Sequence, residues 1–473
     1  MQDGAFEGRE TVLARIALRF TSWTERWIPD AFVFALIATV IVFALGLAVV
    51  GASPRTMVSS WGKGFWELIP FTMQMALIII TGYVLATARP VYRLIARLAR
   101  IPRTPRAATL LVAVFAMVTS WLNWGFSLIF SAFLAREVAR RRPDADYRAL
   151  AASSFLGLGS IWAQGLSGSA ALQMCTPGAL QPSIRAVVAH GGLVEGGIIP
   201  LRHTIFLWQS LLSVAVEIVL VAILVWFFTP TRARAGTVAV PDAGAGAGVP
   251  EIDRPRTPGE WLEHSPILNL LVVALGGAYL VDHFVSAPDA LGALTLNTLI
   301  LVFLTLGFLL HWTPARLMRA VRDATPATWG VILQFPFYAG IAGMITYTGL
   351  NERIANFFVR ISTPETYPPL ISLYSTVLGV FVPSGGSKWV IEAPYVMQAA
   401  HDLKVHLGWM VAVYDLGEAL ANLVQPFWML PTLAILGLKA RDVMGFTFVV
   451  FLALMPVVLV LVWLLGMTLP YPL

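Results

Sequence analysis

The chain has 473 residues, of which 58% are hydrophobic and 12% are charged, and its formal net charge is +6. Soluble domains carry about 25% charged residues, so this composition excludes an ordinary soluble domain and indicates a polytopic membrane protein. The positive charge does not require a nucleic acid partner, because cytoplasmic loops of membrane proteins are enriched in Lys and Arg. The single cysteine, Cys175, excludes an internal disulfide.

Residues 1–30 are predicted to form an amphipathic segment on the cytoplasmic surface, because four arginines alternate there with apolar residues. Two apolar spans follow at 31–51 and 66–88, each near the ~20 residues that cross a bilayer. No short apolar core with a cleavage site precedes them, so we expect no removed signal peptide. The next loop is rich in arginine, which indicates the cytoplasmic side. Its arginines are Arg89, Arg93, Arg97, Arg100, Arg103 and Arg106.

Residues 107–134 form an apolar run with basic sequence on both sides. As one helix the run would be about 42 Å long, against a hydrocarbon core of about 30 Å. It is either a tilted ordinary span or a hairpin that enters and leaves on the cytoplasmic side. The positive-inside rule favours the hairpin, because a single crossing would leave one arginine cluster outside. Its predicted tip is the polar stretch from Ser120 to Gly125.

The rest of the first half contains a broken span at 149–175, followed by an ordinary span that returns to the cytoplasm. The broken span is interrupted from Gln164 to Ser169, a stretch too rich in Gly and Ser for an undisturbed helix. We therefore assign residues 31–229 to a first repeat. Residues 230–263, which are rich in Gly, Ala and Pro, are predicted to be a flexible cytoplasmic linker.

The second half begins with an extra span at 264–291 and continues with a second repeat at 292–467. This repeat has the element order of the first: two spans, a hairpin, a broken span and a span. Its hairpin, at 369–402, enters from outside, and the tip at 382–388 contains Pro and two Gly. Its broken span is interrupted from Asn422 to Pro426. The sequence therefore predicts an all-α membrane protein with about nine transmembrane helices and two re-entrant helical hairpins in two inverted-topology repeats.

The four breaks should meet near the middle of the bilayer, where non-helical backbone is stable only if it is buried in protein or lines a cavity. Helix starts there present free N–H groups, which suit a carboxylate, while freed carbonyl groups could coordinate Na⁺. The alternative for any one Gly or Ser is close helix packing. The predicted substrate-binding residues are Ser120, Asn123, Trp124, Ser167, Gly168, Ser169, Ser384, Gly385, Gly386, Ser387, Asn422 and Gln425. The tryptophans that can wall a pocket for a short acyl chain are Trp124, Trp162, Trp389 and Trp428.

Charged residues inside a membrane are costly and are therefore functional candidates. Lys388 and Glu392 are four residues apart on one helix face and are expected to form an ion pair. That pair is either structural, or it responds to protons or supports a substrate carboxylate. Asp415 and Glu418 share a helix face, where each favours the protonated form of the other; a water-filled external vestibule explains them equally well. These four residues are the ion-coupling candidates, whereas Glu217 has no partner that the sequence identifies.

The sequence predicts no catalytic residue, no cofactor and no protein metal site. It has no Walker-type loop, no His-Glu-x-x-His motif and no convincing nucleophile with a base, so ATP-driven transport by this chain alone is not expected. A membrane-embedded enzyme would need such a nucleophile or metal ligands at the breaks, which offer Ser and Asn but no His. A receptor that binds a substrate without moving it is a further alternative.

The stretches Val-Pro-Ser-Gly-Gly at 382–386 and Asn-Leu-Val-Gln-Pro-Phe-Trp at 422–428 are the most distinctive of the chain. They occur together with Glu25–Asp30, Asn123–Phe126, Leu134–Arg140, Gly165–Ser169 and Gly437–Asp442. With these stretches, the chain from about residue 23 to residue 467 resembles the bacterial short-chain fatty acid transporters of the acetoacetate/butyrate type. The resemblance implies a secondary carrier of small monocarboxylates, coupled to H⁺ or Na⁺, in the bacterial cytoplasmic membrane.

The resemblance also implies a wider superfamily of inverted-repeat ion transporters, which usually form homodimers and often move one domain against a fixed scaffold. On the predicted topology the N-terminus is cytoplasmic and the C-terminus external. The chain departs from the family at Ser387-Lys388-Trp389 and at Glu392, where the family usually has Gly-Gln-Trp and a later Gln. We hypothesise that the Lys388 ammonium replaces a bound cation, which favours H⁺ over Na⁺. A carrier for another small organic anion, such as a dicarboxylate or an amino acid-like substrate, is the alternative.

Overall fold

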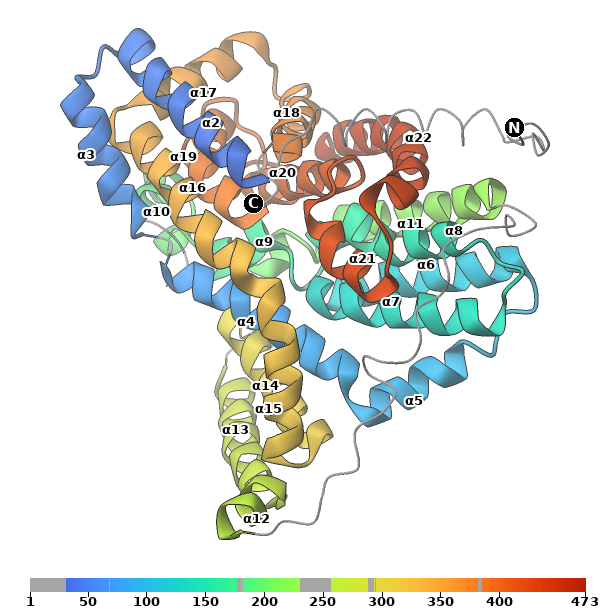
Figure 1. The fold of residues 1–473 in the computed structure, drawn as a ribbon. Coiled ribbons are helices and arrows are strands. Elements are labelled where there is room, and N and C mark those ends of the chain that lie inside the picture. Colours follow the sequence, from blue (N-terminus) through green and yellow to red (C-terminus); the bar gives the residue numbers. More distant parts are fainter. Residues whose placement is uncertain are drawn as a thin grey trace, which may run out of the picture.

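The structure is a computed structural model that describes residues 31–67, 69–176, 180, 182–229, 257–287, 293, 295–381 and 385–473. These residues form helices and connecting loops without a β-strand (Figure 1). In the first half the α-helices are α2 (Ala31–Leu45), α3 (Pro54–Phe65), α4 (Ile69–Thr87), α5 (Arg89–Leu98), α6 (Pro105–Leu122), α7 (Trp124–Arg141), α8 (Tyr147–Leu156), α9 (Ser169–Cys175), α10 (Pro182–Val188) and α11 (Trp208–Phe228). In the second half they are α12 (Pro258–His264), α13 (Ile267–Ser286), α14 (Leu296–His311), α15 (Pro314–Ala324), α16 (Trp329–Tyr347), α17 (Leu350–Ile361), α18 (Tyr367–Phe381), α19 (Gly385–Asp402), α20 (Leu407–Asn422), α21 (Leu430–Leu436) and α22 (Ala440–Gly466).

Short π and 3₁₀ turns interrupt or join these helices. The π turns are η1 (Gly46–Val50) and η2 (Gly157–Ile161). The 3₁₀ turns are η3 (Trp162–Gln164), η5 (His190–Gly192), η6 (Glu195–Gly197), η7 (Leu201–His203), η8 (Thr325–Thr328) and η9 (Phe427–Met429).

Seven helical elements of the described residues are long and apolar enough to cross a membrane, and α20 with its bent continuation makes up to eight. The predicted all-helical, multi-span membrane fold is therefore confirmed. The number of candidate spans differs from the expected nine because three helices have other lengths than predicted. The helices α2 and α14 are predicted spans, but they are only 15 and 16 residues long. The helix α6, an arm of the first predicted hairpin, is itself long enough to count as a span.

The helices α6 and α7 lie side by side and are joined at Asn123 (Figure 1). Asn123 has extended backbone angles, and its Oδ1 accepts a hydrogen bond of 2.7 Å from the Phe126 N–H, so it caps α7. The Phe115 and Phe130 rings stack at 4.6 Å, at nearly equal distances along the chain from this tip. These contacts make residues 105–141 an antiparallel helical hairpin, slightly longer than the predicted 107–134.

The first broken helix passes from α8 through the turns η2 and η3 into an extended stretch before α9. Glycine is required at its start, because a Cβ on Gly157 would lie 2.1 Å from the Ala116 carbonyl oxygen of α6. The extended part is tied to the first hairpin, since the Leu166 N–H donates to the Trp121 carbonyl oxygen at 2.7 Å. The interruption therefore lies where the sequence predicts it, and it is packed against the tip of α6.

The second half also contains a helix pair followed by a broken helix. The helices α18 and α19 flank residues 382–384, which lie outside the described residues. The helix α20 is buried along its whole length, and after a short turn the chain continues at an angle of 69° into η9 and α21. The Phe427 N–H at the start of that continuation donates to Gln425 Oε1 at 2.7 Å, so a side chain of the break caps the new direction.

The predicted linker differs from the structure at its end. Residues 230–256 lie outside the described residues, as do residues 1–30, but residues 257–263 are not a free linker. The Thr257 hydroxyl caps α12, which leads directly into α13. In Figure 1, α12, α13, α14 and α15 project together from the rest of the molecule, with α14 packed against α4, and most of α13 is exposed.

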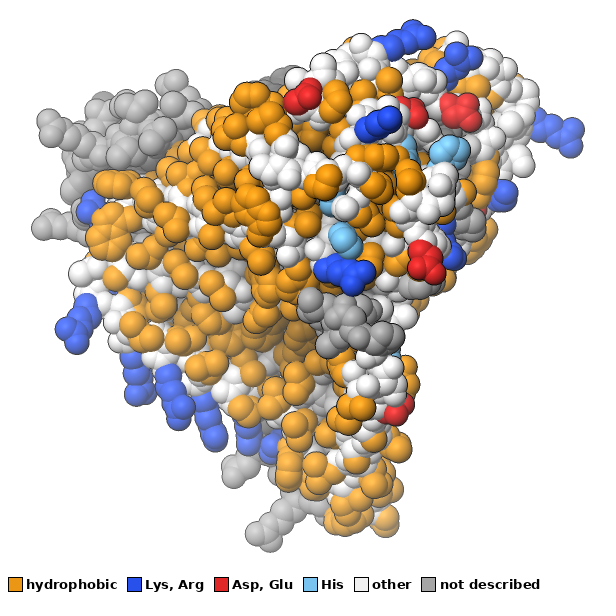
Figure 2. All heavy atoms as spheres, turned by 180° about the vertical axis from the view of Figure 1, so that it is seen from behind, with side chains coloured by type: hydrophobic (Ala, Val, Ile, Leu, Met, Phe, Trp, Pro, Cys, Tyr) orange, Lys and Arg blue, Asp and Glu red, His pale blue; other side chains and the backbone are white. Residues whose placement is uncertain are grey.

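The surface of the molecule is divided by side-chain type. Figure 2 shows a broad apolar band and, along one edge, a row of Lys and Arg side chains. On α5, Arg93 and Arg97 are exposed, whereas Ile95 on the opposite side of the helix is buried. Such a helix suits the boundary between lipid and water.

Candidate functional site

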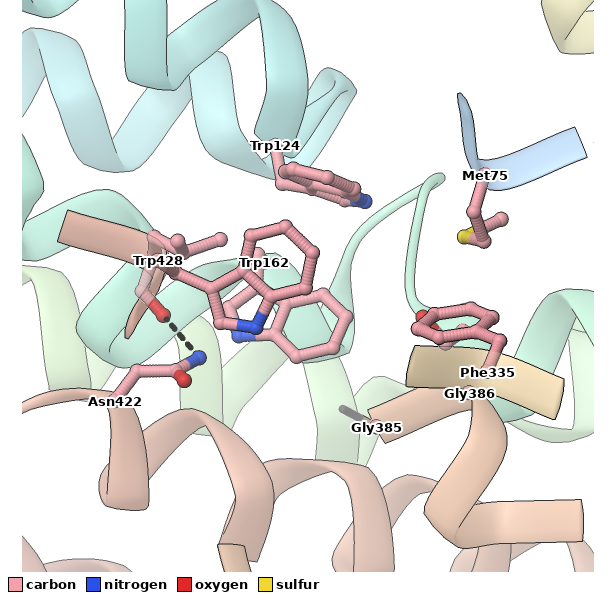
Figure 3. Close-up of a pocket in the computed structure, with 10 residues that line it drawn as sticks. Met75, Trp124, Trp162, Phe335, Gly385, Gly386, Asn422 and Trp428 are labelled. Atoms are coloured by element: carbon pink, nitrogen blue, oxygen red, sulfur yellow. Dashed lines mark hydrogen bonds between the residues drawn. The ribbon is translucent and has the colours of Figure 1, made fainter. Parts of the chain in front are cut away.

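A small cavity lies where the first hairpin, the start of α19 and both broken helices meet (Figure 3). The cavity is narrow in this conformation, with a volume of about 20 Å³. The cavity therefore brings together elements that are far apart in the sequence. Its lining residues are Met75, Trp124, Leu158, Trp162, Ser169, Phe335, Gly385, Gly386, Asn422 and Trp428.

Aromatic side chains form most of the cavity wall. Trp124 at the start of α7 and Trp428 in η9 are in edge-to-face contact, with ring centroids 5.2 Å apart. Figure 3 shows Trp162 and Trp428 on one side, with Met75 and Phe335 across from them. Aromatic faces and a thioether bind hydrocarbon without requiring a hydrogen bond. These walls suit a short apolar chain.

Trp389, which the sequence also placed in this wall, does not line the cavity. It is fully buried on α19, and its ring lies 4.7 Å from the ring of Tyr414 on α20. Gly385 and Gly386 line the cavity at the start of α19. Trp389 lies one helical turn further along α19, beyond the cavity, where it packs against α20.

The polar part of the cavity is formed by Ser169, Asn422 and the first turn of α19. The first N–H groups of a helix have no acceptor within that helix, so they are available to a ligand. Glycine lets this turn approach the aromatic wall, because a Cβ on Gly385 would lie 2.8 Å from the Trp162 ring. A Cβ on Gly386 would lie 2.3 Å from the Phe71 ring. Larger residues at either position would displace the walls.

Several predicted site residues hold the breaks in shape. The Ser167 hydroxyl accepts a 2.8 Å hydrogen bond from the Trp124 N–H, which joins the first broken helix to the hairpin tip. Asn422 Nδ2 donates to the Leu158 carbonyl oxygen at 3.3 Å, and its Oδ1 accepts from Gln425 Nε2 at 2.6 Å. The Asn422–Leu158 bond, drawn as a dashed line in Figure 3, joins the two broken helices beside the cavity, whereas the Gln425–Asn422 bond stabilises the second break itself.

The remaining predicted residues lie around the cavity without lining it. Ser120 is fully buried beside Gly157, and its hydroxyl has no hydrogen-bond partner among the described residues. Gly168 caps α9, and a Cβ on it would lie 2.4 Å from the Ala163 carbonyl oxygen. Ser384 lies outside the described residues, and Ser387 belongs to α19.

A cluster of buried charges lies directly behind Gly385. Lys388 Nζ forms a 2.7 Å ion pair with Glu418 Oε2, and both side chains are at most 1% exposed. The ammonium also donates to the Ser375 carbonyl oxygen at 2.6 Å and lies 3.0 Å from its hydroxyl. Its position above the Tyr414 ring, 5.2 Å from the centroid, adds a cation–π contact.

The expected Lys388–Glu392 ion pair is wrong. The spacing of four residues permits that pair, but Lys388 turns toward α20 and pairs with Glu418 instead. Glu392 lies against the tyrosines Tyr395 and Tyr414, and its Oε2 has no hydrogen-bond partner among the described residues. Sequence spacing on α19 could not reveal a carboxylate supplied by α20.

Asp415 connects this cluster with the cavity. Its Oδ2 accepts a 3.1 Å hydrogen bond from the Ala170 N–H at the start of α9. Its Oδ1 lies 2.7 Å from where a Cβ on Gly385 would be. Asp415 and Glu418 are both fully buried, so they do not line a water-filled vestibule in this conformation.

The structure adds lining residues that the sequence analysis missed. Met75 on α4 and Phe335 on α16 come from uninterrupted apolar helices, and Leu158 comes from the π turn η2. Ser375, which holds Lys388, lies within α18. No local signal distinguishes these residues from their apolar or small neighbours, because only helix packing turns them toward the site.

Comparison with known proteins identifies the family. Residues 12–465 match the family model described as short chain fatty acid transporter. The chain belongs to the short-chain fatty acid transporter family. A provisionally named short-chain fatty acid transporter of Escherichia coli (strain K12) is 38% identical over 439 residues, which cover 92% of this chain and 96% of that protein. A protein of the same provisional name from Haemophilus influenzae is 34% identical over 442 residues, with the same coverage of both chains.

Solved structures support the membrane-transporter fold of this family member. The YdaH transporter of Alcanivorax borkumensis, described as having an unusual topology, matches with a TM-score of 0.59 at 14% identity and covers 93% of this chain. The match covers 98% of YdaH. MtrF of Neisseria gonorrhoeae, from a class of antimetabolite efflux pumps, matches with a TM-score of 0.56 at 13% identity and covers 96% of this chain and 97% of its own. Its family and the curated relatives, together with its apolar helices, make the chain a multi-pass bacterial membrane transporter and not an enzyme.

Proposed function

We propose that this protein is a secondary active transporter that carries short-chain monocarboxylates across the bacterial cytoplasmic membrane together with protons. The observation that carries the proposal is the cavity between the breaks, which combines aromatic walls with a helix start. Trp124, Trp162 and Trp428 bind the acyl chain, and the first turn of α19 with Ser169 binds the carboxylate. The resemblance to the acetoacetate/butyrate type supports the same substrate class.

The chemistry of the lining favours one carboxylate over two. No Lys, Arg or His side chain belongs to the described lining, whose residues are mostly aromatic or apolar. A dicarboxylate or an amino acid-like substrate would bury a second charge against that wall at a large desolvation cost. Uptake competition by acids of each class separates these alternatives: inhibition by dicarboxylates at the concentration effective for butyrate would overturn the assignment.

The surroundings of Lys388 support protons as the coupling ion. Its ammonium is held by a carboxylate, a carbonyl and a hydroxyl oxygen, which are the ligand types that Na⁺ uses at breaks in transporter helices. A tethered ammonium thus fills a place where a free cation would bind. Three carboxylates, on Glu392, Asp415 and Glu418, face this one cation in a buried region, so protons on the remaining carboxyl groups are the least costly way to balance the charge.

We further propose an elevator-type movement within a homodimer, with a cytoplasmic N-terminus and an external C-terminus. The hairpins and broken helices contact one another around the cavity, which supports their moving as one unit against the remaining helices. The basic row beside α5 supports a cytoplasmic position for that edge. Labelling of single cysteines introduced near each terminus tests the orientation, and mass measurement of the purified protein tests the dimer.

Flux into proteoliposomes tests the function directly. Labelled acetate, butyrate and acetoacetate are offered with a pH gradient, a Na⁺ gradient or neither. We expect accumulation of the monocarboxylates with an inward proton gradient alone. Accumulation driven by Na⁺ without a pH gradient would overturn proton coupling, and binding without flux of any of the three acids would overturn transport.

A further inference from the structure

Glu217 is a buried carboxyl group that the proposed mechanism does not use. It lies in the middle of α11, whose other positions are largely apolar, and its side chain is fully buried. Gln164 Nε2 donates to Glu217 Oε1 at 2.6 Å, and the Ser213 hydroxyl donates to the same oxygen at 2.7 Å. Glu217 Oε2 has no hydrogen-bond partner among the described residues. Both donors thus converge on one of the two carboxyl oxygens.

This pattern fits a neutral carboxylic acid. The carbonyl oxygen of such an acid accepts two hydrogen bonds, and the second oxygen carries the proton. A carboxylate would need a compensating positive charge in this apolar region. None of the described Lys, Arg or His side chains forms an ion pair with Glu217, and among the described residues its hydrogen-bond partners are Gln164 and Ser213.

The elements packed against Glu217 bring no charge close to it. The turns η2 and η3 contain no titratable residue. The helix α6 contributes Arg106, near the point where Thr109 bonds Thr229 at the end of α11. The helix α22 carries Arg441 and Asp442 in its first turn, about one turn before Phe446, whose ring contacts Phe228 at the same end of α11. Since Thr229 is twelve residues beyond Glu217, these charges lie about 18 Å away along the helix.

The partner Gln164 connects Glu217 with the substrate cavity. It closes the turn η3, directly before the extended stretch of the first broken helix. Three residues later, Ser167 holds the backbone of Trp124, and Ser169 lines the cavity. The bond between Glu217 and Gln164 therefore attaches the broken helix to the long helix α11.

We propose that Glu217, in its protonated form, is a positioning residue that holds the broken helix through Gln164 and so sets the shape of the substrate cavity. The proposal rests on the proposed function for the identity of the ligand. Loss of the proton places an uncompensated charge beside Gln164 and forces the bond to rearrange or admit water. Monocarboxylate affinity therefore falls at alkaline pH through Glu217, in addition to any effect of the carboxyl groups around Lys388.

Butyrate binding to the purified full-length protein in detergent, read by tryptophan fluorescence from about pH 6 to about pH 9, tests this role. Glu217→Ala and Gln164→Ala should each weaken binding about tenfold, because a buried polar partner is left unsatisfied. Glu217→Gln keeps a carbonyl acceptor without a titrating proton. It should bind as the unchanged protein does at the acidic end and lose less affinity at the alkaline end.

Gln209→Ala is the matched control. Gln209 is buried on the same helix and bonds Thr468 at 2.9 Å, not the broken helix, so its loss should leave butyrate affinity unchanged. Two results would overturn the proposal: Glu217→Gln binding as weakly as Glu217→Ala, or Glu217→Gln and the unchanged protein sharing one pH profile.

A second measurement needs no substrate. In a Cys175→Ala background, Ser169→Cys reports the position of the broken helix by its alkylation rate. Adding Glu217→Ala should raise that rate severalfold, whereas adding Gln209→Ala should not; equal rates overturn the proposal. If the unchanged protein binds none of the acids, the proposed function fails, and this labelling still decides the role of Glu217.

Discussion

The two hairpins differ in the residues that stabilise them beside the cavity. At the first tip, the neutral Asn123 caps α7, and a neutral serine, Ser167, holds the next residue. Beside the second tip, α19 carries Lys388 and Glu392, and α20 supplies two more buried carboxyl groups. Both tips reach the same cavity through Trp124 and Gly385. One side of the cavity is thus held by neutral hydrogen bonds and the other by charge.

This difference separates positioning from coupling. The hydrogen bonds of Asn123 and Ser167 at the first tip involve no titratable side chain, so a pH response on that side can come only through Glu217 behind the broken helix. A buried cluster with more carboxyl groups than cations must take up or release protons when its surroundings change. If the transporter is proton-coupled as proposed, the second hairpin with α20 is the coupling element, and the first tip shapes the wall of the cavity. The following substitutions test that division, from the largest expected effect to the smallest.

Lys388→Met should destabilise the protein most, by about 3–5 kcal/mol, because it leaves the Glu418 carboxylate buried without its cation. Thermal unfolding in detergent measures the loss. Adding Glu418→Gln should restore most of the stability while proton-driven accumulation stays absent. If Lys388→Met alone keeps normal stability and proton coupling, the Lys388 cluster is not the coupling element, and the proposed difference between the two hairpins is wrong.

Gly157→Ala should destabilise the neutral side by about 1–3 kcal/mol, because the added Cβ would meet the Ala116 carbonyl oxygen at 2.1 Å. Gly62→Ala on α3 is the matched control, since a Cβ there meets nothing within 4 Å. Unfolding curves compare the two variants. We expect Gly157→Ala to weaken butyrate binding without changing which ion drives uptake; a changed ion dependence would contradict the division of roles.

Asn123→Ala should have the smallest effect, about 1 kcal/mol, because it removes the cap of α7 and leaves the Phe126 N–H without its acceptor. Asn123→Ser retains a capping oxygen and should recover most of that loss. Melting temperatures and butyrate affinity of both variants check this. Recovery of stability without recovery of affinity would mean that the Asn123 amide itself contacts the substrate.

The interruptions were predictable from the sequence because their causes are local. Clustered Pro and Gly weaken a helix, and polar residues such as those at 120–125 and 164–169 stand out in apolar surroundings. The same reasoning identified the buried charges, since a charge within an apolar span is visible without any structure. The all-helical membrane fold follows from composition and span length alone, for the same physical reason.

Only the tertiary structure decided which side chains meet. The spacing on α19 suggested a Lys388–Glu392 ion pair. Because α19 packs against α20, Lys388 forms its ion pair with Glu418 instead. Met75 and Phe335 become cavity walls because of how α4 and α16 pack, and Glu217 acquires Gln164 from a turn 53 residues earlier. A one-dimensional pattern records where a helix breaks and where a charge is buried. The partner that compensates that charge is set by helix packing, which depends on the whole chain.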